Sequence, residues 1–413
     1  MKRRAVITGL GIVSPIGVGT EAFWNAAVAG RSGLSYPSIV DASKLPRDCH
    51  NVGEVKGFKV TDWMPGVVGK MAARFSQFAV AAAAMASADA RLDEGQFSPR
   101  EFKVSIGTAA HGLTDVHEPN FAAFRRGESV VPWMCLEDPA HAATSHVAIA
   151  HGVRGQTTTF ATACAAGLDA IGWAAAEVEA GRAKAVLAGG TETPLSDFIL
   201  MSFHSVGVLS KWQGPPEEAS RPFERSRSGL VLAEGAAVVV VEDEEHARAR
   251  GATIYARIEG FGCATEGAHL RKVDETGEPV ARSISAAIQN AGLSPLDIDY
   301  VAAHGNSMLD YDAAETAGIK LALGPHSWNV PISSLKSMCG QSLAAGSAMQ
   351  VVSSCLILRD QIVHPTINYD VADPECDLDY VPNVARLARV RSVLIHAHSL
   401  GGSHAAMILV RAD

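Results

Sequence analysis

Charged residues are scarce in this chain, and the sequence lacks the features that mark several other classes of protein. Of 413 residues, 19% are charged, and 44 acidic residues outnumber 35 Lys and Arg, so the formal net charge is −9. No Lys/Arg-rich run occurs, which argues against nucleic acid or an anionic membrane as a partner. No apolar stretch approaches the ~18–20 residues that a membrane-spanning helix needs. The composition, 47% hydrophobic with 38 glycines and 19 prolines, is that of a globular protein with a large core.

Paired cysteines are also missing. The seven cysteines are scattered and form no Cys-x-x-Cys pair, which is typical of reduced thiols, with at most one or two taking part in chemistry. We therefore place the protein in the cytoplasm. The start of the chain imitates a signal peptide, but Gly9, Gly11 and Pro15 break its apolar part and no cleavage site of small residues follows. We expect a buried first strand and a turn there.

Short apolar runs alternate with Ala-rich helical patterns, which predicts an α/β fold. The expected strands are 5–8, 104–107, 157–163, 185–190, 236–242, 255–259, 298–303, 330–334 and 393–398. The expected helices are 74–92, 165–180, 279–292 and 341–360. At ~100–200 residues per domain, the length predicts two domains or one duplicated unit.

The two halves of the chain share a faint repeat. Ala5-Val-Ile-Thr-Gly-Leu-Gly11 resembles Ala256-Arg-Ile-Glu-Gly-Phe-Gly262, and Cys164-Ala-Ala-Gly167 opens a helix as Leu343-Ala-Ala-Gly346 does. Each match is short, and chance similarity in an Ala/Gly-rich chain is the alternative. We expect an N-terminal half of 1–250 and a C-terminal half of 251–413 in one compact body, with the seam near 247–251.

Cys164 occupies the turn between a predicted buried strand and the helix that follows it. Free backbone N–H groups and the helix dipole at such a turn stabilise a thiolate and could hold an oxyanion. A buried structural cysteine is the alternative, and it suits Cys355, in mid-helix, far better. His304 and Lys336 each follow a predicted strand, and Gln341 opens a helix. Together with the thiolate they would form an acyl-transfer site, although each alone suits an ordinary surface or core position.

Three further patterns do not indicate a site. Gly9-Leu-Gly-Ile-Val-Ser14 has Ser where the third glycine of a dinucleotide-binding motif belongs. Ser333-Ser-Leu-Lys336 lacks the companion motifs of β-lactamases. His396 and His398 alternate on a predicted strand and could share a face, but no carboxylate or cysteine stands at ligand spacing nearby, so we expect no metal site.

Short motifs follow one another along nearly the whole chain. They are Val6-Ile-Thr-Gly-Leu-Gly11, Arg74-Phe-Ser-Gln-Phe78, Thr162-Ala-Cys-Ala-Ala-Gly167, Ala188-Gly-Gly-Thr-Glu192, Ser220-Arg-Pro-Phe223, Ala233-Glu-Gly-Ala236, Ala303-His-Gly305, Leu335-Lys-Ser-Met338, His364-Pro-Thr-Ile-Asn368 and Gly401-Gly402. In this order they resemble the elongating, decarboxylative β-ketoacyl-acyl-carrier-protein synthases of the thiolase-fold superfamily. The resemblance implies a thiolase-like α/β fold, with duplicated halves in a layered α-β-α-β-α arrangement, normally dimeric. It also implies no bound cofactor, because the phosphopantetheine arm arrives on the carrier protein.

The resemblance also assigns roles to individual residues. Cys164 is the acyl-accepting nucleophile, and the N–H groups of Cys164 and Leu400 hold the thioester carbonyl. Malonyl-carrier protein then binds, His304 polarises its carbonyl, and the enolate left by loss of CO2 attacks the acyl group. Lys336 orders the site, with Glu315 as its expected partner. Preorganised donors aimed at the enolate would dominate the rate of this chemistry.

The second catalytic histidine of the family is replaced here by Gln341. Its amide can donate an N–H bond to an enolate oxygen but cannot carry a proton or a charge. Losing one transition-state donor commonly costs ~100–1000-fold in rate, which favours slow or repurposed chemistry. A related branch of the superfamily uses Cys-His-Asn, so an amide at this position is compatible with catalysis in principle.

Other departures lie at positions that would contact substrate. Asn306 and Met308 replace the residues expected to bond the pantetheine arm. Ala110 replaces the bulky residue that closes the acyl pocket at the dimer interface, and Leu400 replaces the gate phenylalanine. Phe203 belongs to the same substrate-contacting set. The smaller side chains leave more room for a long, rigid or aromatic-headed acyl chain, and we hypothesise a specialised polyketide, polyene or lipid pathway.

Three functions stay open at this stage. The first is an active β-ketoacyl synthase that uses acyl and malonyl thioesters on acyl carrier protein, as a homodimer or a heterodimer with another ketosynthase-like subunit. The second is a silent chain-length-factor subunit of such a heterodimer, which the departures at 306, 308 and 341 favour. The third is a Cys-dependent acyltransferase that cannot decarboxylate its substrate. Retention of Cys164, His304, Lys336 and Glu315 favours the first, because silent subunits usually lose the cysteine.

Overall fold

One continuous mixed sheet of eleven strands carries both halves of the chain in the computed structural model, which describes residues 3–92 and 98–412. In chain order its strands are β1 (Ala5–Ser14), β2 (Gly17–Val18), β3 (Phe102–Gly107), β4 (Thr157–Phe160), β5 (Ala185–Glu192), β6 (Gly235–Asp243), β7 (Ala256–Thr265), β8 (Tyr300–Ala302), β9 (Ile332–Ser333), β12 (Ser392–His398) and β13 (Ser403–Val410). They lie in the order β4-β3-β5-β6-β1-β7-β13-β12-β8-β9, with β2 beside β1. A separate pair is formed by β10 (Ile362–Val363) and β11 (Arg386–Leu387).

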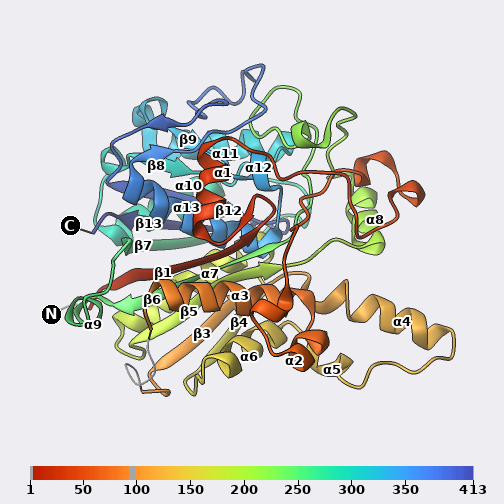
Figure 1. Cartoon of the computed structure of the whole chain (residues 1–413). Helices are drawn as coiled ribbons and strands as arrows, with labels where there is room; N and C mark the ends of the chain where they lie inside the picture. Colours follow the sequence, from red (N-terminus) through yellow and green to blue (C-terminus); the bar gives the residue numbers. More distant parts are fainter. Residues whose placement is uncertain (1–2, 93–97, 413) are drawn as a thin grey trace.

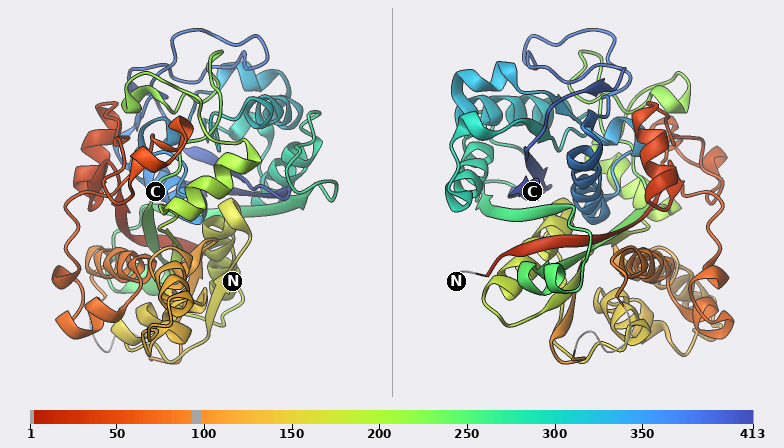
Figure 2. Two further views of the ribbon diagram at one scale, coloured as in Figure 1. Left: turned by 90° about the vertical axis from the view of Figure 1, so that its right-hand side faces the viewer. Right: turned by 60° about the vertical axis from the view of Figure 1, so that its left-hand side comes forward.

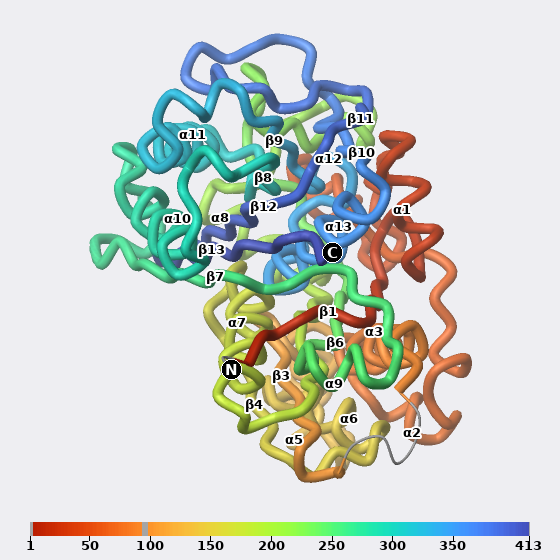
Figure 3. The backbone as a smooth tube through the Cα atoms, turned by 90° about the vertical axis from the view of Figure 1, so that its left-hand side faces the viewer, coloured from red at the N-terminus to blue at the C-terminus, as the bar shows by residue number. Residues whose placement is uncertain are grey.

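The two halves of the sheet meet at β1. This strand pairs with β6 along its length but with β7 only over its first residues, where Ala5 lies opposite Ile258 and Ile7 opposite Ala256. Figure 3 shows β1 running between the two sets of strands. The equivalent central strands β1 and β7 therefore join two similar halves, as the repeat in the sequence suggests.

Helices cover both faces of each half of the sheet. They are α1 (Thr20–Val28), α2 (Gly66–Met71), α3 (Arg74–Asp89), α4 (His117–Arg125), α5 (Met134–Glu137), α6 (His141–Ala150), α7 (Ala166–Glu179), α8 (Asp197–Val206), α9 (Glu244–Ala249), α10 (Glu278–Ala291), α11 (Leu309–Leu323), α12 (Lys336–Cys339) and α13 (Leu343–Asp360). Helices α3 and α6 pack on the outer face of the N-terminal half, α10 and α11 on that of the C-terminal half, and α7 and α13 lie between the halves (Figure 1). This is the α-β-α-β-α layering of the thiolase-like fold that the resemblance implies.

The two central helices approach each other closely at their N-terminal ends. A Cβ on Gly167 would lie 2.3 Å from the carbonyl oxygen of Ala344, and a Cβ on Gly190 would lie 2.5 Å from the same atom. Only glycine permits this contact, because a side chain at either position would overlap the backbone of α13. The contact brings the turn before α7, with Cys164, next to the turn before α13, with Gln341.

Each expected strand and helix forms, but three strands are shorter than expected, among them β8 (Tyr300–Ala302) and β9 (Ile332–Ser333). The segment predicted as a buried strand over 157–163 forms β4 only to Phe160, and Thr157 is exposed. The reason is its place at the edge of the sheet, where β4 pairs only with β3 among the described strands. The strand at the start of the chain is buried throughout, from Ala5 to Ser14, as expected.

Helix α1 belongs to the N-terminal half of the chain but packs against the C-terminal half. The indole N–H of Trp24 donates to Asp360 at the end of α13 over 2.6 Å, and the N–H of Gly33 donates to the carbonyl of Met338 over 2.9 Å. Both views in Figure 2 place this helix, in red, beside the C-terminal half. Within the described ranges, no helix combines the length and apolar character that crossing a bilayer requires.

Candidate active site

Cys164 lies in a tight turn between β4 and α7. The preceding residue, Ala163, has φ 51°, a left-handed conformation that costs free energy for a residue with a side chain. The Ala165 N–H donates to Ser399 Oγ over 2.9 Å, and this hydroxyl donates to the carbonyl of Thr162 over 2.8 Å. One serine therefore fastens both sides of the turn and links it to the loop between β12 and β13.

The Cys164 thiol is buried among polar groups from three other segments. The amide Nε2 of Gln341 lies 3.1 Å from the sulfur and donates to it. Burial raises the pKa of Cys164 to about 11, and the positive charge of Lys336, the Leu400 N–H and Gln341 oppose this shift. The resting sulfur is therefore a thiol, surrounded by groups that favour the thiolate.

His304 is held from its backbone by two charged side chains. Lys336 donates from Nζ to the His304 carbonyl over 2.6 Å. Glu315 accepts the N–H groups of His304 and Gly305 over 2.7 and 2.8 Å, and it accepts from Nδ1 of His396 over 2.7 Å. Glu315, the expected partner of Lys336, forms no ion pair with it: the carboxylate is occupied by the loop and by a histidine, and it attracts the ammonium at longer range.

The attraction of Glu315 at this distance does not keep the pKa of Lys336 at its usual value. Burial lowers the pKa of Lys336 to about 8, although the negative charge of Glu315 opposes that shift. Burial alone would raise the pKa of Glu315, but its bonds to His396 and to the backbone outweigh burial and lower it. Glu315 is thus an anion at neutral pH, while Lys336 begins to release its proton at a pH only slightly above neutral.

The ring of His304 faces two N–H groups. The His398 backbone N–H points at Nδ1 over 3.3 Å, and the Asn306 amide nitrogen lies 3.2 Å from Nε2. Burial, and then Lys336, hold the pKa of His304 well below its usual value, so the ring is neutral and has a single acceptor nitrogen. Only one of the two contacts can be a hydrogen bond. The His398 N–H is fixed by the backbone, so we assign the hydrogen bond to this contact. The ring proton of His304 then lies on Nε2.

The residues expected to contact substrate gather in one apolar cluster with the nucleophile. Ala110, Met308, Phe203 and Leu400 all pack in the cluster that contains Cys164. The first two are buried, and the last two are partly buried. Asn306 lies behind this cluster, buried, with its amide oxygen accepting the Met308 N–H over 3.0 Å.

Glu192 ends one of the motifs that carry the family resemblance, but the sequence did not reveal which groups it contacts. It accepts from the Thr108 hydroxyl over 2.6 Å and from the N–H groups of Ala109 and Ala110 over 2.8 and 3.1 Å. Burial raises the pKa of Glu192 to about 7, and these bonds oppose the shift. Glu192 thus fixes the loop that places Ala110 in the apolar cluster around Cys164.

Sequence reasoning also missed His404 and Glu266, which join His396 and His398 in a buried group beside His304. His396 and His398 do share a face of β12, as predicted, and His404 lies directly opposite His398 on β13. The carboxylate that the sequence pattern lacked comes from Glu266, which follows β7 and lies 3.2 and 3.1 Å from the two histidines His398 and His404. Only the pairing of three strands reveals this neighbourhood.

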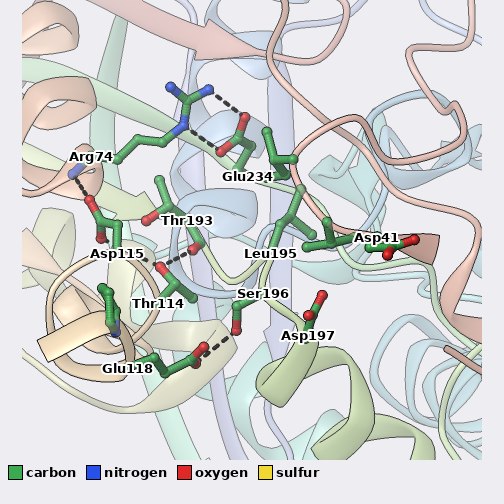
Figure 4. A pocket seen from close by; sticks show the side chains of 13 residues that line it. Asp41, Arg74, Thr114, Asp115, Glu118, Thr193, Leu195, Ser196, Asp197 and Glu234 are labelled. Atoms are coloured by element: carbon green, nitrogen blue, oxygen red, sulfur yellow. Dashed lines mark hydrogen bonds and ion pairs between the residues drawn. The ribbon is translucent and has the colours of Figure 1, made fainter. Parts of the chain in front are cut away.

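A separate acidic cavity of about 560 Å³ opens between α4, α8 and the start of α3 (Figure 4). Arg74 closes one side, bonded to Glu234 over 2.8 and 2.7 Å, and the Asp115 carboxylate accepts the Arg74 backbone N–H. Glu118 bonds Ser196 on the opposite side over 2.7 Å. None of the predicted catalytic residues lines this cavity, so it is not part of the Cys164 site.

Comparison with known proteins agrees with this geometry. The family model described as "Beta-ketoacyl synthase, N-terminal domain" matches residues 2–247, and that of the C-terminal domain matches residues 255–370. The ketoacyl synthase alpha subunit of the tetracenomycin polyketide synthase of Streptomyces glaucescens is 36% identical over 99% of this chain and 97% of its own length. The 3-oxoacyl-[acyl-carrier-protein] synthase 2 of a Synechocystis strain is 37% identical, over 97% and 96% respectively.

Solved structures give the same result. A type II polyketide ketosynthase in complex with its acyl-carrier protein, AntDE:AntF, is 35% identical with a TM-score of 0.92, and all of each chain is covered. The ishigamide ketosynthase/chain length factor is 30% identical with a TM-score of 0.91, again over both full chains. The match of both family models and of relatives along their whole length shows that the chain belongs to the β-ketoacyl synthase family.

Proposed function

We propose that this protein is a β-ketoacyl-acyl-carrier-protein synthase that condenses an acyl thioester with malonyl-carrier protein and releases CO2. The observation that carries the proposal is the setting of Cys164: a buried sulfur at the start of α7, faced by N–H donors from Leu400 and Gln341 and by the Lys336 charge. A structural cysteine needs none of these groups. The family relatives named above act on carrier-protein substrates according to their names.

Acyl transfer to the enzyme is the first half of the reaction. The Cys164 thiol gives up its proton, which is carried away by the pantetheine thiol at the end of the step, and the thiolate attacks the thioester carbonyl of the acyl-carrier protein. The oxygen of the tetrahedral intermediate takes the negative charge, which the N–H groups of Cys164 and Leu400 stabilise. Collapse of the intermediate breaks the carbon–sulfur bond to the pantetheine thiol, which leaves with a proton. A new thioester on Cys164 remains.

Condensation is the second half. The malonyl thioester carbonyl accepts hydrogen bonds from Nε2–H of His304 and from the Gln341 amide, and its carboxylate leaves as CO2. The electron pair of the broken carbon–carbon bond forms an enolate, whose oxygen accepts the hydrogen bonds from His304 and Gln341. The enolate carbon attacks the acyl carbon on Cys164, and the thiolate is regenerated as the ketoacyl product leaves. Lys336 holds the His304 carbonyl and stabilises negative charge in the site.

Partners and setting follow from the same proposal. The substrates arrive on acyl carrier protein, and the enzyme works as a homodimer or with a second ketosynthase-like subunit; the ishigamide structure is named as a ketosynthase/chain length factor. The small side chains Ala110 and Leu400 support a long or rigid acyl chain and a specialised polyketide, polyene or lipid pathway. Seven free thiols support a reducing compartment, the cytoplasm.

A Cys-dependent acyltransferase is the second candidate, and Gln341 is the observation that favours it. An amide donates a hydrogen bond but cannot supply the positive charge of a protonated histidine to a developing enolate. Loading of Cys164 needs no group at position 341 to titrate. The protein would then pass its acyl group to another nucleophile without decarboxylation.

Intact-protein mass spectrometry separates these functions. The purified chain is incubated with acyl-carrier protein, and malonyl-carrier protein is then added while CO2 and ketoacyl product are followed. Cys164→Ala removes the nucleophile, and Cys135→Ala is the matched control at an exposed cysteine. Acylation that needs Cys164 and is followed by product supports the synthase. Acylation without product supports the transferase, and no acylation, together with a heterodimer on co-expression, supports the chain-length-factor subunit.

A further inference from the structure

The group formed by Glu266, His398 and His404 has no part in the proposed condensation. Its three side chains come from three neighbouring strands: His398 ends β12, His404 lies opposite it on β13, and Glu266 directly follows β7. The Glu266 N–H donates to the carbonyl of Gly402 over 2.9 Å, which fixes the carboxylate beside the β12–β13 loop. All three side chains are almost completely shielded from solvent.

The distances within the group match those between ligands of one metal ion. Nε2 of His398 and Nε2 of His404 lie 3.2 and 3.1 Å from the same oxygen of Glu266, and one ligand atom from each residue lies within 4.8 Å of the others. Around a tetrahedral zinc ion with bonds of about 2.0–2.1 Å, neighbouring ligand atoms are about 3.3 Å apart. Two imidazoles and one carboxylate, with a position left for water, form a common zinc ligand set.

Hydrogen bonding alone does not account for the position of His398. Neither of its ring nitrogens has a hydrogen-bond partner among the described residues, although the ring is buried. Nε2 is close to Glu266 but lacks the geometry of a hydrogen bond to it. Leaving a buried polar atom unpaired costs free energy, and a metal ion at the point where the three ligand atoms converge would remove that cost.

The surroundings orient the other ligands in the way metal sites require. Nδ1 of His404 lies 3.5 Å from Nε2 of His396, whose Nδ1 contacts Glu315 over 2.7 Å. The second oxygen of Glu266 accepts the Asp274 N–H over 3.2 Å. In zinc sites the second nitrogen of a ligand histidine is often held by a carboxylate; here His396 links Glu315 to His404, while Nδ1 of His398 has no such partner among the described residues.

We infer that Glu266, His398 and His404 bind a divalent transition metal, zinc in the first instance, which holds the two ends of the β12–β13 loop together. That loop carries Leu400, whose N–H faces the Cys164 sulfur, and the backbone N–H of His398 reaches His304. The metal therefore sets the position of an oxyanion donor without touching substrate. A cavity of about 430 Å³, lined by Ser403 and His404, adjoins the group.

Metal content and metal-dependent stability of the full chain, purified without a polyhistidine tag, test the site in the absence of any acyl donor. We expect about one tightly held zinc ion per chain, and a Co(II) derivative with the visible absorption of a coordinated ion. Glu266→Gln and His404→Gln should abolish both signals. His396→Gln, which changes only the group behind a ligand, should weaken zinc binding by about 10–100-fold.

His204→Gln is the matched control, because His204 belongs to the other group of potential ligands, with Asp48 and Cys49. Zinc binding that survives His204→Gln and disappears in Glu266→Gln supports the site. Binding lost only in His204→Gln, or equal in all variants, overturns it. If a Glu266 or His404 variant does not fold, His204→Gln decides, because it lacks the other group: a melting temperature of this variant that zinc raises and a chelator lowers supports the site, and one that neither changes overturns it. The result does not depend on whether Cys164 is acylated.

Discussion

The side-chain amide of Gln341 donates to the sulfur of Cys164 over 3.1 Å, joining the turns before two central helices that lie 177 positions apart in the chain. The amide oxygen of the same residue is buried and has no hydrogen-bond partner among the described residues. An unpaired acceptor in a dry site costs free energy unless a substrate group satisfies it. The Gln341 amide thus uses one N–H on Cys164, which leaves its second N–H for an enolate oxygen and its carbonyl oxygen for a donor group of the substrate.

Replacing Gln341 separates the two half-reactions. We expect Gln341→Ala to reduce condensation by about 100-fold, because one donor to the enolate is lost, while acylation of Cys164 changes only a few-fold. Gln341→Glu, of the same shape, places a negative charge beside the sulfur, raises the pKa of Cys164 further and slows acylation. Single-turnover mass spectrometry of each step measures both effects. Equal losses in both steps for Gln341→Ala would contradict a role in condensation.

Alkylation of Cys164 should depend steeply on pH. Because the pKa of Cys164 is raised to about 11 by burial, the thiolate fraction at neutral pH is small and grows about tenfold per pH unit up to that value. The rate of iodoacetamide labelling at this residue should rise accordingly between about pH 7 and 9. Peptide mapping distinguishes the adduct from those at the exposed Cys135 and Cys263. A rate that is flat over this range would show a preformed thiolate instead.

The size of the residue at position 110 should set the accepted acyl chain. Ala110 is buried in the cluster that contains Cys164, and Glu192 fixes its loop. Ala110→Phe fills that space, so we expect acylation by long-chain donors to fall by at least about tenfold while short-chain donors change little. The comparison of acylation rates for a series of acyl-carrier proteins measures this, with Ala109→Val, a partly buried neighbour in the same cluster, as a control. Uniform loss across the series would indicate misfolding of the loop.

Local patterns predicted an α/β fold and part of the site, while the thiolase-like layering came from the resemblance of the ordered motifs. The strand-to-turn-to-helix pattern around Cys164 placed the cysteine at the start of a helix, with a nucleophile and a structural cysteine as alternatives, and the positions of His304 and Lys336 after strands placed them at the same end of the sheet. These predictions depend on periodicity and chain order alone, which the structure keeps. The edge strand was misjudged because β-branched residues at 157–160 indicate a strand but do not reveal whether a neighbour covers it.

The rest of the site depends on contacts between distant segments. Glu266 meets His398 and His404 only because β7 and β12 both flank β13, and no spacing in the sequence records that pairing. Glu315 acts on Lys336 only at longer range for a similar reason. A carboxylate beside a buried ammonium is the simplest electrostatic expectation, but the loop after β8 offers backbone N–H groups and His396 offers a ring nitrogen at closer range.

His364 gives the protein a defined sensitivity to acid. It is buried, and burial lowers its pKa from 6.5 to about 4. The unfolded chain therefore binds a proton at this residue below about pH 6.5, while the folded chain stays neutral there until about pH 4. Stability is fully present above pH 6.5 and falls as the pH drops through this window, by up to about 1.4 kcal/mol per pH unit for this group.

Urea unfolding at several pH values measures that slope. His364→Gln keeps a polar side chain of similar size but removes the titration, so the variant should lose less stability on acidification than the unmodified chain. The comparison is made on the slope against pH, which a constant loss of packing does not change. Identical slopes for the two proteins would show that the ring is protonated in the folded state as readily as in the unfolded one.

Ser399 links the β12–β13 loop, which carries Leu400, to the turn that carries Cys164. Removal of its hydroxyl should affect both stability and acylation. Its hydroxyl accepts the Ala165 N–H and donates to the Thr162 carbonyl, and Leu400 follows it directly. Ser399→Ala removes two hydrogen bonds and leaves the Ala165 N–H and the Thr162 carbonyl only their mutual contact of 3.3 Å, which costs about 1–3 kcal/mol of unfolding free energy. Because the Leu400 N–H then loses its fixed position, acylation should slow by more than the remaining folded fraction explains. Ser399→Thr retains the hydroxyl and should recover most of the acylation rate; a Thr variant as slow as the Ala variant would mean that the bond does not position Leu400.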